Sequence, residues 1–264
     1  EFRRVLFRSE AGSLVVPDGV IVLGAGAANT VVKVRCGQAG DAAVELRGQC
    51  VIEDLTVQAA PGKNGCMIRA DGESARPTLR RCLLLPDDNA FAAASAWRHA
   101  APTLSHCVIV SPVGGYGVFA RSAAAPVIDH CTIVSRGFGV GMMDGSAPTV
   151  SRCIIVGQSP GVLIQADCKP AVSDSVIFCR ENSTAYPFPI TRWTTKPAPA
   201  EAAGAKIVVE PARDIIARHD ILMLDPKLKQ GQSASDYLVP QNPEAAACGA
   251  YADSQPWPAP VKQQ

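Results

Sequence analysis

The sequence predicts an all-β solenoid, a parallel β-helix in which short strands stack from one coil to the next. A nine-residue segment recurs five times with equivalent positions at 82, 107, 131, 153 and 175, so each coil takes about 22–25 residues. A second segment, which begins with Gly117, Gly139 and Gly161, recurs in step with it. Both segments alternate apolar and other residues, and no helical stripe lies between them. A repeat of this length indicates stacked coils.

The composition agrees with such a fold. The 264 residues are 47% hydrophobic but only 5% aromatic, and Gly (22) and Pro (21) are frequent. A chain of this length buries a sizeable core, and its small apolar residues and turn formers do not suit a helical bundle. Lys and Arg number 25 against 24 Asp and Glu, a net charge of +1. The absence of a strong basic field argues against a nucleic-acid partner.

The chain divides into one domain with two irregular ends. Residues 1–10 are interpreted as a non-native leader, because Leu6-Phe7-Arg8-Ser9 resembles a translated sequencing adaptor. Residues 11–181 are expected to form the coils, 182–252 a long loop and closing coil, and 253–264 a flexible tail. A missing N-terminal cap predicts an exposed strand edge on the first coil and a tendency to associate. No apolar run is long enough for a transmembrane helix.

The nine-residue repeat, first seen as Pro77–Leu85, predicts three ladders of inward side chains. One coil cannot bury its own apolar side, so each strand pairs with its copy in the next coil, about 4.8 Å away. The ladders comprise Leu79, Leu104, Ile128, Val150 and Val172, then Cys82, Cys107, Cys131 and Cys153, then Leu84, Ile109, Ile133, Ile155 and Ile177.

The second repeat points Val118, Val140 and Val162 inward and leaves an outward strip. Its side chains are expected in two rows with a turn beside them, namely Arg69, Trp97, Arg121, Met143 and Gln165, then Met67, Ser95, Phe119, Gly141 and Leu163, with Arg98, His99, Asp144 and Asp167 at the turn. The strip is therefore aromatic and apolar, and arginine, histidine and aspartate edge it.

The residues after the coils lose this periodicity. Thr184–Ala203 is rich in Pro and Ala and is expected to be a long loop. Glu210–His219 is expected to be either a short helix or an extended segment, and Ile221–Leu224 a strand of the closing coil. The segment 182–224 also carries Trp193, so it can fold back and cover the outward strip.

The ten cysteines do not form a metal-binding pattern. No Cys-x-x-Cys pair exists, so a zinc site is not predicted. The four ladder cysteines are expected to be free buried thiols, since stacked side chains point in parallel and disulfide geometry is poor. Cys168 and Cys179 lie outside the ladder and can bridge, so the redox compartment stays open.

A row of turn residues precedes the ladder cysteines and includes His106 and His130. A metal bound there needs a third ligand from Asp129 or Asp174. A row of turn side chains in contact with solvent explains the pattern equally well, so no metal and no cofactor is predicted.

The repeat resembles the right-handed parallel β-helix of the pectin-lyase-like superfamily. The opening Val16–Gly26 and the close, with Asp225-Pro226 and Gly249-Ala-Tyr251, are similar to the first and last coils of many secreted bacterial members. The resemblance covers about residues 14–252 and implies an extracellular or cell-envelope location. It is specific for the fold and weak for activity, because this fold hosts lyases, hydrolases, epimerases, adhesins and inert modules.

Relatives commonly bind polysaccharide along such a strip, so the first hypothesis is a secreted or envelope module that contacts carbohydrate without a recognisable catalytic set. A sugar ring stacks on Trp or Phe, and Arg binds uronate carboxylates in a forked geometry. The candidate carbohydrate-binding residues are Arg69, Trp97, Arg98, Phe119, Arg121, Asp144 and Gln165.

The second hypothesis is a polysaccharide lyase or epimerase that acts on uronate-containing glycans. Arg121 is then the base or carboxylate clamp, and His99 or His130 assists proton transfer. The stretch around His130 resembles the Ile-Asp-His of calcium-dependent pectate lyases, but Phe138-Gly139 stands where those enzymes have an acidic Asp-Gly. The paired aspartates of hydrolase members are absent as well. The third hypothesis is a purely structural surface protein.

Overall fold

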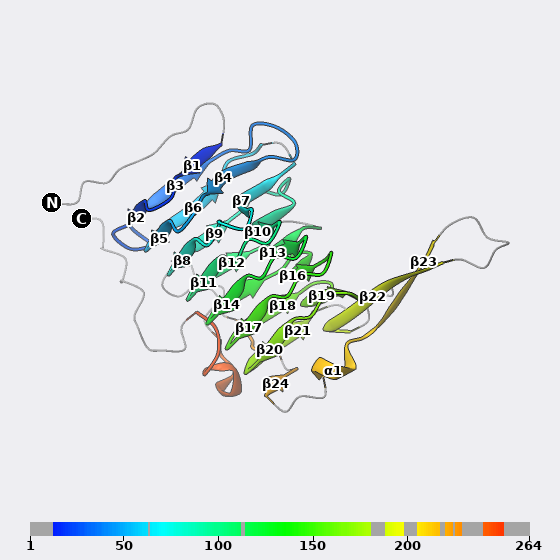
Figure 1. Ribbon diagram of the computed structural model, residues 1–264. Coiled ribbons are helices and arrows are strands. Elements are labelled where there is room, and N and C mark those ends of the chain that lie inside the picture. The colour runs from blue at the N-terminus through cyan, green and yellow to red at the C-terminus, as the bar shows by residue number, and fades with distance from the viewer. Residues whose placement is uncertain are drawn as a thin grey trace.

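The computed structural model describes residues 13–62, 64–111, 114–180, 188–197, 205–216, 220–223, 225–228 and 240–250. Nearly all of its elements are strands, which stack as coils around one apolar interior (Figure 1). The leader and the tail expected from the sequence lie outside the described residues.

Each coil contributes one strand to each of three sheets. Sheet 1 contains β1 (Leu14–Val16), β4 (Ala42–Leu46), β7 (Cys66–Asp71), β10 (Ala92–Trp97), β13 (Tyr116–Arg121), β16 (Phe138–Met142), β19 (Val162–Gln165), β22 (Ile190–Pro197) and β23 (Ala205–Pro211). Sheet 2 contains β2 (Ile21–Leu23), β5 (Val51–Glu53), β8 (Thr78–Arg80), β11 (Thr103–Ser105), β14 (Val127–Asp129), β17 (Thr149–Ser151) and β20 (Ala171–Ser173). Sheet 3 contains β3 (Val31–Val34), β6 (Thr56–Ala59), β9 (Leu83–Leu85), β12 (Val108–Val110), β15 (Thr132–Val134), β18 (Ile154–Gly157), β21 (Ser175–Cys179) and β24 (Ile221–Leu222).

The strand register confirms the predicted inward ladders. Leu104 lies opposite both Leu79 and Ile128 in parallel strands, and every member of the three ladders is buried. The residue just before each ladder cysteine has a positive φ, as with His130 at 49°. This left-handed residue turns the chain from sheet 2 into sheet 3 in each coil, a conformation that costs a residue with a side chain about 1–2 kcal/mol.

The cysteine ladder consists of free thiols, as expected. Its four members are fully buried, and the Cys131 thiol donates to the Leu104 carbonyl of the preceding coil at 3.5 Å. Ser175 occupies the same position one coil later and donates to the Ser173 carbonyl at 2.6 Å. All ten cysteines are buried and none forms a disulfide, so Cys168 and Cys179, which the sequence allowed to bridge, are not joined. Both thiols are buried instead of bonded to each other.

These thiols are expected to resist alkylation in the folded chain. Burial raises the pKa of the Cys131 thiol, and burial together with the nearby Asp167 charge raises the pKa of Cys168 to about 11. The thiolate is the reactive form, so iodoacetamide at pH 8 should label the folded chain far more slowly than the urea-unfolded chain. Mass spectrometry after a short pulse measures this. Rapid labelling of the ladder cysteines in the folded chain would contradict it.

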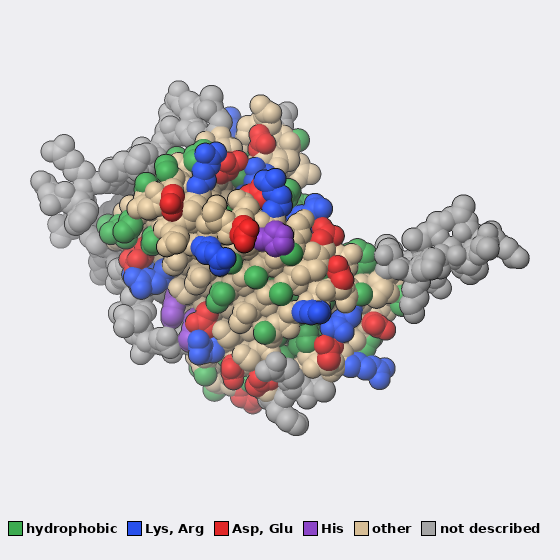
Figure 2. Space-filling model, in the orientation of Figure 1, with side chains coloured by type: hydrophobic (Ala, Val, Ile, Leu, Met, Phe, Trp, Pro, Cys, Tyr) green, Lys and Arg blue, Asp and Glu red, His purple; other side chains and the backbone are tan. Residues whose placement is uncertain are grey.

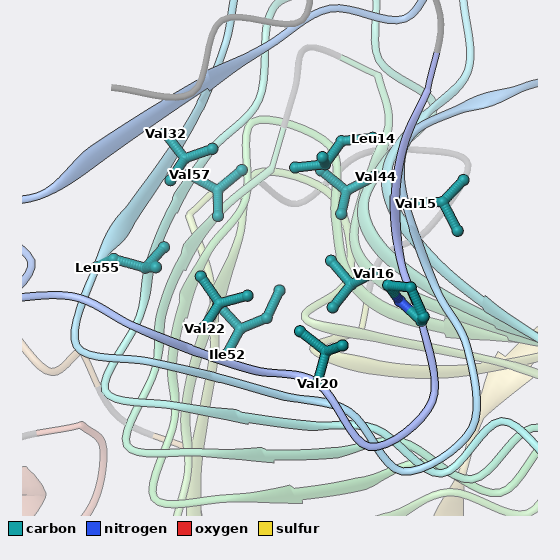
Figure 3. Close-up of a pocket in the computed structure, with 11 residues that line it drawn as sticks. Leu14, Val15, Val16, Val20, Val22, Val32, Val44, Ile52, Leu55 and Val57 are labelled. Carbon is teal, nitrogen blue, oxygen red and sulfur yellow. The ribbon is translucent and has the colours of Figure 1, made fainter. Parts of the chain in front are cut away.

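The two ends of the solenoid differ. At the C-terminal end, helix α1 (Arg213–Ile216) follows the last coil, and Ala212 and Ile215 are buried in the common core (Figure 1). At the N-terminal end, β1, β2 and β3 each have an outer edge that no described strand pairs with. A cavity of about 190 Å³ opens there, and only aliphatic side chains and Pro17 line it (Figure 3).

We expect this chain to associate with a second copy through the open end. Ile21 and Leu23 are 63% and 58% exposed beside the unpaired strand edges, and such edges template pairing with another chain. Replacing both residues with lysine should shift the chain toward monomer in analytical ultracentrifugation over a concentration series. Val127→Lys, an exposed position in the body of sheet 2, is the control. Equal sedimentation of parent and double variant would contradict the expectation.

The described residues that directly follow β19 add strands to sheet 1, and none of them lies over its outward strip. β22 pairs in parallel with β19, and β23 returns antiparallel to β22, so the two form a hairpin that projects from the body (Figure 1). The long loop expected over Thr184–Ala203 is therefore wrong for Ile190–Pro197, and residues 184–187 and 198–203 of that span lie outside the described residues. Of the two alternatives for Glu210–His219, the short helix holds for Arg213–Ile216 (α1), Glu210 and Pro211 end β23, and residues 217–219 lie outside the described residues. The closing strand is confirmed for Ile221–Leu222 (β24).

A later segment covers the outer face of sheet 3. The short helix η1 (Pro243–Ala245) and the turn after it pack on Ile154 and Val176 through Ala245 and Cys248. The Ala250 N–H donates to the Thr132 hydroxyl at 3.0 Å. Sheet 3 is thereby closed to solvent there, while no described segment after β19 lies over the corresponding strip of sheet 1.

Candidate functional site

The outward face of sheet 1 holds the predicted strip, with one correction of register. Trp97 lies opposite Arg121 on one side and Asp71 on the other. Arg69 lies opposite Ser95, in the neighbouring row that contains Phe119. Arg69 lies eight residues before Pro77, whereas Trp97 lies five before Pro102, so Asp71 and not Arg69 takes the β7 position of the predicted row. Met67, expected in the outward row, is buried in the interior.

Phe119 lies on this face but under other rings. It is 2% exposed, with the ring centroids of Phe91 and Tyr116 at 4.9 Å and 4.7 Å. The expected stacking of a sugar on Phe119 is therefore not available in this arrangement. Sequence reasoning missed both covering rings, although the recurring aromatic residues at the starts of β13 and β16, Tyr116 and Phe138, were a usable signal.

Trp97 stands between two arginines. The guanidinium carbon of Arg69 lies 5.5 Å from the centroid of the indole, and that of Arg121 lies 5.3 Å from it. The two arginines come from β7 and β13, the strands on either side of β10. Cations at these distances are attracted to the faces of an aromatic ring, so the two arginines stabilise the indole in its position between them.

Each predicted arginine is paired with a carboxylate. Arg69 meets Glu45 at 2.9 Å, and Arg121 meets Asp144 at 3.1 Å. Arg98 makes two hydrogen bonds of 2.6 Å to Asp71. The outward face of sheet 1 is therefore charge-balanced and not a basic patch. Basic and acidic side chains are also interspersed over the side of the molecule that Figure 2 draws.

The pairing joins several predicted residues and adds two that were missed. The backbone N–H of Asp144 donates to the Gln165 side chain at 2.8 Å, so Arg121, Asp144 and Gln165 form one group. Glu45 and Asp71 complete the arginine pairs but were not predicted. Opposite charges at matching positions of adjacent coils were the signal that sequence reasoning could have used.

Several polar atoms of sheet 1 are buried without a partner. Among the described residues, the buried side-chain atoms that lack a hydrogen-bond partner are Arg69 Nε, Trp97 Nε1, Arg192 Nε, Trp193 Nε1 and Thr194 Oγ1. All five belong to β7, β10 or β22 of sheet 1. Four of them are N–H donors, so sheet 1 contains hydrogen-bond donors that have no acceptor oxygen.

Of the candidate catalytic residues, His99 lies at the same corner of the coil as Arg121 and His130 does not. His99 is exposed in the turn after Trp97, and its backbone N–H donates to the carbonyl of Ser122, the residue after Arg121, at 3.0 Å. His130 lies beyond β14, at the corner between sheets 2 and 3, where its ring stacks on His106 with centroids 4.8 Å apart. Its Nδ1 lies 2.9 Å from Asp129. Arg121 and His130 thus belong to different corners of the coil.

The described residues also contain no cluster of three or more His, Cys, Asp or Glu side chains that could hold a metal ion. No described helix has the length and apolar character needed to cross a membrane.

Comparison with known proteins agrees with this architecture. The profile of the family described as "Right handed beta helix region" matches residues 18–186, which contain β2 to β21. No curated protein and no solved structure matches the chain. The family match covers more than half of the sequence and coincides with the coils described above. The chain therefore belongs to the right-handed β-helix family.

Proposed function

We propose that this chain is a carbohydrate-contacting module without a recognisable catalytic set, and that the outward face of sheet 1 is its contact surface. The observation that carries the proposal is the set of buried N–H donors without acceptors on that sheet. A buried donor left unsatisfied costs about 1–3 kcal/mol. Sugars present ring and hydroxyl oxygens at every residue, so a glycan that displaces the side chains covering these donors supplies the missing acceptors.

Trp97 is the centre of the proposed surface. The Arg121 side chain is 45% exposed, so it can change rotamer without disturbing the core and uncover the indole. The freed ring then offers a face for stacking and its Nε1–H for a hydrogen bond. Arg69, Arg98, Asp144 and Gln165 form the polar rim, and Phe119 supports the surface from beneath.

The lyase or epimerase alternative has less support. Arg121 forms an ion pair with Asp144, so its guanidinium is already occupied and is not free to act on a substrate. His130 lies at another corner of the coil, so it is not placed to assist there. Incubation with pectate, alginate or glycosaminoglycan, followed at the absorbance of unsaturated uronate, tests this alternative. Product formation would replace the binding module with an enzyme.

An extracellular or cell-envelope location is part of the proposal, and its support is the resemblance to secreted bacterial β-helices. The ten free cysteines are compatible with it, because buried thiols are inert toward oxidants. Detection of the protein in the secreted or envelope fraction of its source cells tests this location, and confinement to the cytosol would contradict it.

The binding proposal predicts that Trp97→Ala weakens glycan binding by about tenfold or more, because both the ring face and its donor are lost. Glycan-array binding of the parent and the variant measures this. Thr149→Ala, at an exposed outward position of sheet 2, is the matched control and should bind as the parent does. Nil binding by the parent, or equal binding by Trp97→Ala, would favour a purely structural role, with which the complete charge pairing of the face agrees.

A further inference from the structure

We propose that the glycan taken by sheet 1 is an uncharged linear polysaccharide and not a polyuronate. This inference rests on the proposed function and names the ligand class of the same surface. Three features carry it: the arginines of the face are already neutralised, the unmet hydrogen-bonding groups are donors that need no charge, and the groups repeat along the solenoid axis.

The arginines are not free to take a uronate carboxylate. A uronate that binds Arg121 in the forked geometry must displace Asp144, which lies 3.1 Å away. The same holds for Asp71 at Arg98 and for Glu45 at Arg69. Each displaced carboxylate is left unpaired beside the negative charge of the ligand, and like charges at such distances repel. At each arginine, the new ion pair with a uronate therefore adds about as much binding free energy as the broken ion pair within the protein removes.

A neutral glycan avoids this exchange. The N–H groups of Trp97 and Trp193 and the Nε–H of Arg69 lack acceptors. An indole N–H is a donor only and carries no charge, so a hydroxyl or ring oxygen satisfies it as completely as a carboxylate does. The ion pairs of the rim stay intact, so the binding free energy is not reduced by breaking them.

The arrangement favours a chain over a single sugar. Trp97 lies level with Arg121, and Trp193 lies level with Gln165 in the same outward direction. From β10 to β22 there are four strand steps, or about 19 Å at the usual spacing of strands. Met143, between them, packs in the same apolar cluster as both tryptophans. A linear polymer that runs along the solenoid axis contacts the whole row.

The first experiment compares polymer classes on the full chain. Affinity electrophoresis with a neutral panel (β-glucan, mannan and arabinoxylan) and a charged panel (polygalacturonate and alginate) is run at about 50 mM and about 500 mM NaCl, since salt screens charge attraction. We expect a neutral polymer to bind with less than about twofold change between the two salt concentrations, and polyuronates to bind at least about tenfold more weakly.

The second experiment uses variants that separate donors from charges. Trp97→Phe keeps a ring but removes the N–H, and it should weaken neutral-polymer binding about tenfold. The triple variant Glu45→Gln, Asp71→Asn and Asp144→Asn frees three guanidiniums and should gain salt-sensitive binding of polygalacturonate, about tenfold over the parent. Asp71→Asn alone frees Arg98, the most exposed of the three arginines. This single variant replaces the triple variant in the binding measurement if circular dichroism shows that the triple variant does not fold.

The outcomes separate the two proposals. If the parent prefers polyuronates, with steep salt dependence and loss in Trp97→Ala, the carbohydrate surface stands and the neutral ligand is overturned. If neutral polymers bind but Trp97→Phe binds equally well, the donor argument is overturned. If no polymer of either panel binds, the proposed function fails, and the inference fails with it.

Discussion

We expect the Ile133→Ala substitution to lower the free energy of unfolding by about 2–5 kcal/mol. Ile133 is fully buried in β15, and its register partners in the adjacent coils are Ile109 and Ile155. Truncation removes the transfer free energy of the side chain and leaves a cavity between two ladder neighbours that cannot both collapse into it. Urea denaturation followed by circular dichroism measures the loss, which is large against a total stability of about 5–15 kcal/mol.

The matched control is Val127→Ala in β14, where the side chain is 37% exposed on the outer face of sheet 2. It should change the unfolding free energy by less than about 0.5 kcal/mol. Coils of a solenoid contact mainly their neighbours, so a weak middle coil should also broaden the transition or split it in two. A loss in Ile133→Ala no larger than in the control would show that the inward ladder does not dominate stability.

The coils were predictable because the repeat specifies register twice. Alternation assigns each side chain to the inside or the outside, and the recurrence of Cys82, Cys107, Cys131 and Cys153 fixes which residues meet across strands. A one-residue slip in register would turn the side chains of every ladder toward solvent, so the pattern is compatible with only one strand register. The hairpin of β22 and β23 has no copy elsewhere in the chain, and its Pro- and Ala-rich sequence carries no such constraint.

The covering segment was misassigned for a physical reason. Trp193 suits a covering loop, yet the same aromatic residue also suits the outward row of a sheet, where it lies level with Gln165. The segment that does cover a sheet carries small residues. A Cβ on Gly249 would lie 2.6 Å from the Thr132 hydroxyl oxygen, so its close approach needs glycine. Neither a hydrophobic pattern nor the repeat period predicts from the sequence that the segment around Gly249 contacts sheet 3.

The candidate site was predictable where the period is strict and not elsewhere. Trp97, Arg121 and Gln165 share one row because their turns have equal length. Arg69 lies eight residues before the next proline of the repeat and not five, so it falls in the next row, and Asp71 lies opposite Trp97. The burial of Phe119 depends on rings from other positions of the repeat, and inside-or-outside alternation cannot reveal a side chain that is outward yet covered.

We expect Asp129→Asn to lower the free energy of unfolding by about 1–3 kcal/mol at pH 7. The Asp129 carboxylate accepts hydrogen bonds from Ser151 at 2.6 Å, Arg152 at 2.8 Å and His130 at 2.9 Å, at the corner between sheets 2 and 3. The amide oxygen of asparagine can accept some of these hydrogen bonds, but it has no negative charge to form an ion pair with Arg152. Urea denaturation at pH 7 measures the loss. Asp88→Asn is the control, since that carboxylate is 71% exposed beside Arg136.

The same variant tests a pH dependence. Burial raises the pKa of the Asp129 carboxyl, but hydrogen bonds from Ser151, His130 and Arg152 outweigh this and lower the pKa below its usual value. A carboxyl with a lower pKa in the folded chain adds stability above its unfolded pKa of about 3.9, and this contribution is lost as the pH falls through the folded value. The difference between parent and Asp129→Asn should therefore be full at pH 7 and shrink in unfolding measurements below about pH 4. An unchanged difference in acid would mean that Asp129 acts through packing and not through its charge.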